Sequence, residues 1–330
     1  MCKEFRKQMQ QPASAEPSHK NGYKIMKMRK IYMLALLLVS AMVSAQTAVD
    51  YEQRYNLLVS QFGPSGVGVE TVLNNWAKAD STNIKLLSAR FNYYFTKAQT
   101  TEVVTKPQKN YLGMKPLLSL KDTTGKDVYY YQESFFDDEI YGLALKSADK
   151  SAAFHPDNLD FRFMKANAYI AYEKESPDMA LAYLLAMADE DRSRNRPWKY
   201  EGAQAEKGFF EEAMQEYCYS FYSIGSPKAM EAFLKLSEKM AGIYPDNTGF
   251  QNNIGTYSMV VKQDYKAAVK CYDKVLKKHP EDYTAIRNAL LAARKMKNLK
   301  LEKKYLQMLV QHGSDSDKLA AQARLQQIGK

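Results

Sequence analysis

The chain has 330 residues and a formal net charge of +10, and 12% of its residues are aromatic, including 24 tyrosines. With only 15 glycines and 11 prolines, this composition excludes a disordered chain and predicts a packed core. Eight of the Lys and Arg residues lie within residues 1–45, and the rest of the chain has 39 Lys and Arg against 35 Asp and Glu, a net charge of +4. That excess is too small to indicate a nucleic-acid partner.

Residues 28–45 have the three parts of a secretory signal peptide. A cationic start at residues 28–30 precedes the apolar run IYMLALLLVSAMV at residues 31–43, which is too short to span a bilayer as a mature helix. Small residues follow this run, so we expect cleavage between Ala45 and Gln46. The mature protein would then be periplasmic or extracellular and have no stable membrane span. The alternative is that the run remains as an N-terminal membrane anchor.

Apolar residues recur at helical spacing along most of the remaining chain. In residues 209–221, for example, they fall at i, i+1, i+4, i+5, i+8, i+9 and i+12, which places them on one broad helix face. We expect helices, paired by short loops, at 51–62, 67–79, 83–98, 134–154, 159–174, 177–190, 206–224, 227–243, 248–262, 264–278, 282–296, 299–312 and 315–328.

Residues 99–133 break this helical pattern. Apolar and polar residues alternate strictly in 118–120 and 128–130, on either side of the turn sequence Asp-Thr-Thr-Gly-Lys at 122–126. This pattern predicts a β-hairpin inserted between two helices. The predicted fold class is therefore all-α, an antiparallel helix-pair solenoid with a small inserted β-hairpin.

Three helix endings share one sequence pattern, His-Pro-Asp-Asn at 155–158, Tyr-Pro-Asp-Asn at 244–247 and His-Pro-Glu-Asp at 279–282. Proline disfavours a helical conformation at the residue before it, and the Asp or Asn that follows can cap the next helix. Pro245 and Pro280 are 35 residues apart, which indicates a repeat of about that length.

Residues 250–280 also carry Gly255 in the first helix of a pair, Ala268 and Tyr272 in the second, and Pro280 at its end. In this pattern the chain resembles the tetratricopeptide-repeat family, and it is similar to secreted bacterial members of that family. The resemblance implies that Gly255 and Ala268 lie where two helices cross closely. It also implies that the first helices of successive pairs line a groove for a protein partner.

The resemblance is clear over residues 250–312 and loose over 140–190. We therefore divide the chain into an upstream segment and signal peptide (1–45), N-terminal helix pairs (46–98), the β-hairpin insertion (99–133), further helix pairs (134–245) and C-terminal repeats (246–330).

The candidate binding residues follow from this repeat register. On the helix predicted at 282–296, one polar face lies opposite the apolar stripe, and the matching positions one unit earlier lie on the helix at 248–262. The candidate residues are Thr284, Arg287, Leu291 and Arg294, with Asn252, Thr256 and Met259 one unit earlier. Residues 262–304 hold thirteen Lys and Arg against five Asp and Glu. Two guanidinium groups on this face would favour an acidic protein or peptide partner, whereas the alternative is an ordinary solvated helix face.

No catalytic motif accompanies these features. The three histidines beyond residue 45 are His155, His279 and His312, and none has the spacing of a metal site. We expect no cofactor and no metal. The carboxylates at 133 and 137–139 are densest, and we interpret them as the charged first turn of a helix rather than as a hard-cation or hydrolase site.

Two further groups of residues have competing interpretations. Tyrosines at 129–131, with Phe135 and Phe136, are expected to pack the hairpin on the helices, although they could also form a sugar-stacking platform. Cys218 and Cys271 are expected to be free buried thiols, with a disulfide as the alternative.

The leading hypothesis is a secreted scaffold that binds a peptide, a protein segment or an envelope polymer in its groove. One alternative is a glycan or small-molecule binder that uses the hairpin aromatics. A second is a hydrolase that depends on the carboxylates around Asp137.

Overall fold

The computed structural model describes residues 50–329, and the chain from Tyr51 onward forms one compact unit. The predicted signal peptide and the cleavage position between Ala45 and Gln46 lie outside the described residues. Within the described part, no helix is both long enough and apolar enough to cross a membrane.

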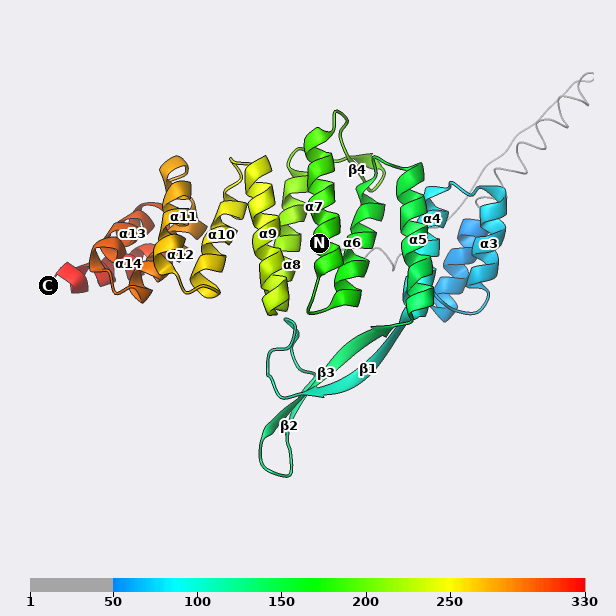
Figure 1. Cartoon of the computed structure of the whole chain (residues 1–330), viewed down its shortest axis with the longest axis horizontal. Coiled ribbons are helices and arrows are strands. Elements are labelled where there is room, and N and C mark those ends of the chain that lie inside the picture. The colour runs from blue at the N-terminus through cyan, green and yellow to red at the C-terminus, as the bar shows by residue number, and fades with distance from the viewer. Residues whose placement is uncertain (1–49, 330) are drawn as a thin grey trace, which may run out of the picture. The chain divides into compact units, whose positions relative to one another are not determined.

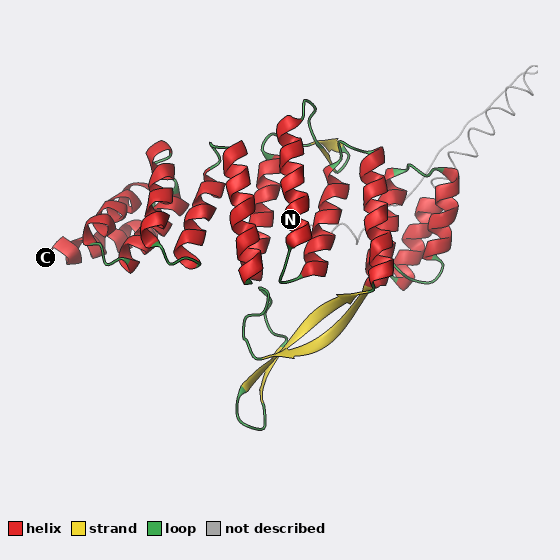
Figure 2. Ribbon diagram, viewed as in Figure 1, coloured by secondary structure: helices red, strands yellow, loops and turns green. Residues whose placement is uncertain are grey.

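Helices make up most of this unit, and consecutive helices lie side by side in chain order (Figures 1 and 2). After a first helix at residues 50–62 come α3 (Val69–Ala79), α4 (Ile84–Ala98), α5 (Asp138–Phe154), α6 (Leu159–Glu173), α7 (Asp178–Ser193), α8 (Phe209–Ile224), α9 (Pro227–Ile243), α10 (Thr248–Val260), α11 (Tyr265–Lys278), α12 (Tyr283–Lys295), α13 (Leu299–His312) and α14 (Asp315–Gly329). The predicted all-α fold of helix pairs with a small β insertion is confirmed.

Three helices end at the Pro-Asp and Pro-Glu sequences, as predicted. The C-cap residues that follow α5, α9 and α11 are His155, Tyr244 and His279, and each stands directly before a proline. The next helix is then capped by a side-chain oxygen, as when Asp282 accepts a hydrogen bond from the Ala285 amide at 2.8 Å. These caps explain why the loops between the C-terminal helices are short.

The insertion is a three-stranded antiparallel sheet between α4 and α5. Its strands are β1 (Gln99–Lys106), β2 (Leu118–Lys121) and β3 (Asp127–Phe136), in the order β1-β3-β2. The predicted hairpin corresponds to β2 and β3, whereas β1 was not predicted. β3 continues to Phe136, so α5 begins four residues later than the predicted start at 134. The sequence did not indicate β1 because its apolar and polar residues do not alternate as they do in a half-buried strand. Six of its eight residues are exposed.

The loop between β1 and β2 holds the sheet against the helices. The Tyr131 hydroxyl on β3 donates hydrogen bonds to the carbonyls of Gln108 and Lys109, at 2.8 and 2.6 Å. Gly113 in the same loop has a φ of +72°, and a Cβ there would lie 2.3 Å from the Ser223 carbonyl oxygen of α8. Only glycine therefore fits this contact between the loop and the end of α8.

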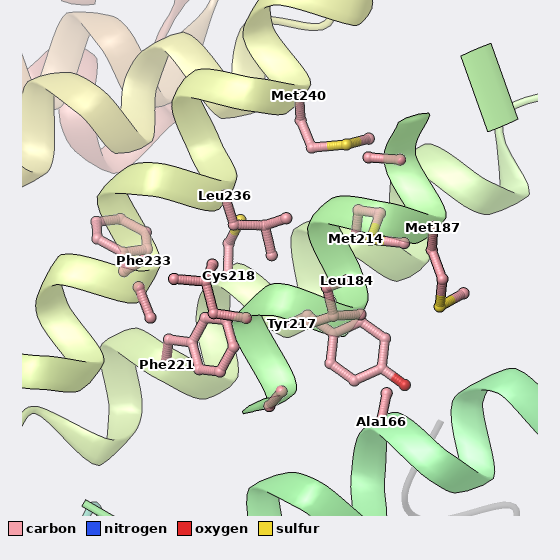
Figure 3. Packing of buried hydrophobic residues seen from close by; sticks show 14 of the residues in the cluster. Ala166, Leu184, Met187, Met214, Tyr217, Cys218, Phe221, Phe233, Leu236 and Met240 are labelled. Carbon is pink, nitrogen blue, oxygen red and sulfur yellow. The ribbon is translucent and has the colours of Figure 1, made fainter. Parts of the chain in front are cut away.

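Four apolar clusters form the core of the described residues, and two of them are large. The central cluster joins α6 to α10, and its buried members include Leu184, Met214, Phe221 and Leu236 (Figure 3). The second cluster joins α11 to α14. Each helix pair therefore contacts its neighbours along the chain, as expected of stacked repeats.

A second, two-stranded sheet was not predicted. It consists of β4 (Lys199–Tyr200) and β5 (Ala203–Gln204), in the long loop that separates α7 from α8. The turn residues Glu201 and Gly202 both have positive φ, at 50° and 79°, which is typical of a two-residue hairpin turn.

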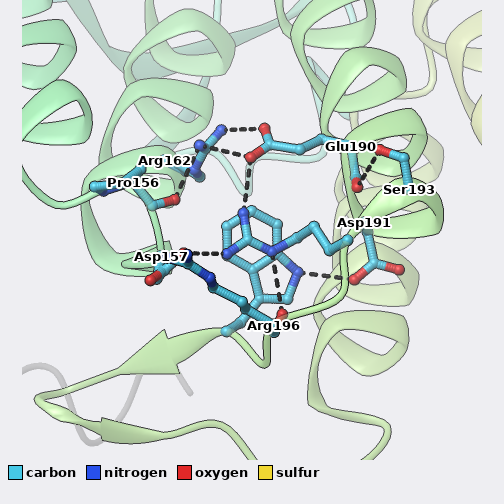
Figure 4. A network of polar contacts seen from close by, with 9 residues as sticks. Pro156, Asp157, Arg162, Glu190, Asp191, Ser193 and Arg196 are labelled. Atoms are coloured by element: carbon cyan, nitrogen blue, oxygen red, sulfur yellow. Dashed lines mark hydrogen bonds and ion pairs between the residues drawn. The ribbon is translucent and has the colours of Figure 1, made fainter.

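Figure 4 shows the polar network that anchors the beginning of this loop. Glu190 on α7 accepts hydrogen bonds from the two terminal nitrogens of Arg162, at 2.7 and 2.9 Å, and from Arg194 at 2.9 Å. The Arg194 guanidinium lies 3.5 Å from the centre of a Trp198 ring, and the Trp198 indole donates to Asp191 at 2.8 Å. These groups bind one another, and only the Arg162 Nε within the network is buried without a hydrogen-bond partner among the described residues, so we assign the network to stability rather than to binding.

Candidate functional site

The structure brings four of the seven predicted binding residues together. Thr284, Arg287, Leu291 and Arg294 of α12 line one hollow of about 460 Å³. The other side of the hollow is α14, and part of its lining comes from α13. The lining residues from these two helices are Leu306, Leu309, Asp317, Ala320 and Ala321.

The sequence of α12 sets this orientation. Its alanines, with Ile286 and Leu290, are buried in the C-terminal core cluster. Thr284, Arg287 and Leu291 fall on the opposite side of the helix and are exposed. The polar side of α12 is therefore held toward the hollow by the burial of the other side.

Arg287 has one hydrogen bond and one opposing charge nearby. Its Nη1 donates to the Tyr283 hydroxyl at 3.2 Å, and that hydroxyl donates to Asp317 at 2.5 Å. The Ser314 and Tyr283 hydroxyls, together with the charge of Arg287, lower the pKa of the Asp317 carboxyl. Asp317 therefore orients Tyr283, while Arg287 keeps donor groups available to a ligand.

Arg294 has a structural role that its sequence position did not indicate. Its Nε lies 3.0 Å from the Glu302 carboxylate, and Arg324 of α14 approaches the same oxygen at 2.9 Å. Glu302 is only 4% exposed, and hydrogen bonds from Arg324 and Arg294 lower its pKa. Arg294 therefore lines the hollow and also holds a buried carboxylate, so removing it would leave Glu302 with one partner fewer.

The three predicted residues of the earlier unit do not line this hollow. Asn252 is buried and donates to Asp282 at 3.2 Å, Thr256 bonds to the Asn252 carbonyl at 3.0 Å, and Met259 packs against the C-terminal cluster. Asn252 and Met259 therefore face the following unit, while the Thr256 hydroxyl lies 3.3 Å from the Tyr272 hydroxyl of α11. The prediction that they form an open groove with the α12 residues is wrong in this respect.

The 35-residue repeat explains why Arg287 lines the hollow whereas Asn252, one unit earlier, does not. Adding 35 to Asn252 and Asp282 gives Arg287 and Asp317, so the buried Asn252 of one unit corresponds to the exposed Arg287 of the next, and both aspartates are half-buried. Asp317 was not predicted to line the hollow. Its spacing from Asp282 is the sequence signal that could have identified it.

The carboxylate cluster separates into two groups. Asp137 caps α5 by accepting a hydrogen bond from the Ile140 amide at 2.9 Å, and Asp138 and Glu139 occupy its first turn, as predicted. Glu133 instead lies on β3, buried between Lys174 at 2.6 Å and Lys106, so its assignment to that turn is wrong. Within residues 50–329, no group of three or more His, Cys, Asp or Glu could hold a metal ion.

Several aromatic side chains of the hairpin pack against other rings of the protein. Tyr131 is 1% exposed, with its ring 5.5 Å from that of Tyr111, and Phe136 packs against Tyr141 of α5. Phe135 lies under the Lys174 ammonium, 4.0 Å from the nitrogen to the ring centre. Tyr131 and Phe136 therefore pack within the fold, while Tyr129 and Tyr130 are half-buried and Phe135 is partly exposed.

Both predicted thiols are free in the described structure. Cys218 is buried in the central cluster and accepts a hydrogen bond from Ser237 at 3.4 Å, and burial raises its pKa to about 12. Burial also raises the pKa of Cys271, which is half-buried. Neither thiol is activated for nucleophilic chemistry.

Comparison with known proteins identifies no matching family model and no similar curated protein. The hollow between α12 and α14 is therefore interpreted from its own residues.

Proposed function

We propose that the protein is an exported, non-enzymatic interaction module that binds an acidic segment of a partner polypeptide in the hollow between α12 and α14. The observation that carries this proposal is the gathering of Thr284, Arg287 and Leu291 around one hollow beside a helix pair. A guanidinium, a hydroxyl and an exposed leucine suit a segment that carries both a carboxylate and an apolar side chain.

Charge supports an acidic ligand over a basic one. Residues 262–304 have a local net charge of +8, and Arg287 lies within that segment. Asp317, the acidic residue in the lining of the hollow, already accepts a hydrogen bond from Tyr283, and the buried Glu302 behind Arg294 pairs with two arginines. An incoming carboxylate would therefore meet an excess of positive charge.

Export is the second part of the proposal, and it depends on the apolar run at residues 31–43. The intact mass of protein recovered from outside the cytoplasm tests it. A mature N-terminus at Gln46 supports export by a cleaved signal peptide, and a retained 31–43 segment contradicts it.

The binding proposal is tested by affinity capture with matched variants. Arg287→Gln removes the guanidinium without adding a charge that would repel Asp317, and it should abolish capture of the partner. Lys295→Gln makes the same change in charge on an exposed residue of α12 outside the lining of the hollow, and it should leave capture nearly unchanged. Capture should also weaken as salt rises, because exposed charges are screened over about 8–10 Å.

If both variants lose capture equally, the partner binds a diffuse basic surface and not the hollow. Capture that survives Arg287→Gln would place the partner elsewhere on the protein.

A further inference from the structure

A second hollow, of about 510 Å³, lies at the other end of the described helices. Its walls are the helix at 50–62, α3, α4, α6 and the turn between β4 and β5. It shares no lining residue with the hollow between α12 and α14.

The apolar part of this hollow is aromatic. Trp76 and Phe161 are each 1% exposed, and Tyr55 lies beside Trp76 with 6.4 Å between ring centres. Ala89 and Met164 complete this part of the lining. The Trp76 indole N–H has no hydrogen-bond partner within residues 50–329, which is uncommon for a buried donor.

The polar part of the hollow is acidic. Glu52, Asp160 and Glu201 line it, against the single cation Lys85, which pairs with Glu52 at 2.7 Å. The Asp160 carboxylate accepts hydrogen bonds from the Glu201 amide at 3.1 and 3.3 Å, so the β4–β5 turn is held at the edge of the hollow.

Burial at this edge disfavours the charged form of the Asp160 carboxyl group. Desolvation is the main cause of a raised pKa at Asp160, and it outweighs the hydrogen bond from the Glu201 amide. A cation placed beside Asp160 would offset that desolvation cost, whereas an anion would increase it.

We propose that this hollow binds a lysine side chain of a polypeptide. The aliphatic stem of the lysine would lie along Tyr55 and Met164, the partly exposed apolar side chains of the lining, and its ammonium would meet Asp160 and Glu201. This site is independent of the hollow between α12 and α14, which we call the acidic-segment site. The two sites bind ligands of opposite charge.

Trp76 also supplies the readout. The chain contains two tryptophans, Trp76 and Trp198, so an amide spectrum of the full protein contains two indole N–H signals, and Trp76→Phe assigns them by removing one. The probe is Nα-acetyl-lysine N-methylamide. Titration should shift the Trp76 signal with a dissociation constant on the order of 1 mM and leave the Trp198 signal in place.

Matched variants test the contribution of the carboxylates. Asp160→Asn combined with Glu201→Gln should weaken probe binding about tenfold, because both partners of the ammonium lose their charge. Glu206→Gln changes the same charge in the same loop outside the lining, and should leave binding within about twofold. Arg287→Gln should leave it unchanged, so failure of this site and failure of the acidic-segment site are distinguishable.

Two further probes define the ligand. Nε-acetylation of the lysine should abolish the shift, because the ammonium is lost. Equal binding of n-butylamine would overturn the polypeptide part of the proposal in favour of a free alkylamine. An unmoved Trp76 signal, equal binding of the Nε-acetylated probe, or equal weakening by Glu206→Gln would overturn the site itself.

Discussion

Gly255 provides a sharp test of the helix-pair packing. It lies within α10, and a Cβ added there would stand 2.6 Å from Tyr272 Cε1 and 2.8 Å from Tyr272 Cζ. The Tyr272 ring is fully buried, and its hydroxyl lies 3.3 Å from the Thr256 hydroxyl. A rigid ring held in this way cannot move aside as the end of a flexible side chain would.

Two opposing effects set the magnitude for Gly255→Ala. Alanine is favoured over glycine inside a helix by about 1 kcal/mol, whereas overpacking a core costs about 1–3 kcal/mol. The net change should therefore lie between about zero and 2 kcal/mol of destabilisation. The control is Gly142→Ala within α5, where an added Cβ meets nothing within 4 Å, so stability should rise by about 0.5–1 kcal/mol.

Urea unfolding followed by circular dichroism measures the global effect, and hydrogen exchange over residues 248–278 measures the local one. In a Tyr272→Leu background the clash partner is absent, so Gly255→Ala should no longer destabilise. If Gly255→Ala stabilises the protein as much as Gly142→Ala does, the close crossing of α10 and α11 is wrong.

Three other predictions test separate parts of the structure. Glu190→Ala should cost about 3 kcal/mol in thermal unfolding, because two mostly buried arginines lose their shared carboxylate; a loss below about 1 kcal/mol would show that they find other partners. Gly113→Ala should speed proteolysis of the β1–β2 loop by forcing it off α8, whereas Gly125→Ala, at a positive φ but in open space, should not. Because the folded-state pKa of Glu302 is lowered, its stabilisation should be complete above about pH 4.3 and be lost as pH falls through the folded value. Glu302→Gln should flatten that acid limb of the stability curve, and an unchanged limb would contradict the assignment.

Local patterns in the sequence predicted most of the fold. Helical periodicity and the Pro-Asp and Pro-Glu endings located the helices to within a few residues, since caps and proline act on their immediate neighbours. The alternation around residues 122–126 located the hairpin for the same reason. β1 was missed because its partner β3 is more than twenty residues away, and long-range pairing leaves no periodic trace in a mostly exposed strand.

The candidate site was predicted only in part. The position of Arg287 followed from the polar side of α12, which local spacing reveals. The pairing of Arg294 with Glu302 and Arg324, and the hydrogen bond from Asn252 to Asp282, depend on how successive repeats stack. The hollow around Trp76 depends on five segments that meet only in the fold, so no single stretch of sequence indicates it.

Site-specific photo-crosslinking in the native cells tests the central claim most directly. A photoreactive residue in place of Leu291, which is 45% exposed and lines the hollow between α12 and α14, is compared with one in place of Leu299 on α13, which is 54% exposed and lies outside that hollow. The account predicts a covalent adduct with one partner polypeptide from position 291, lost on Arg287→Gln, and none from position 299. The absence of an adduct at 291, or the same adduct from both positions, would contradict it.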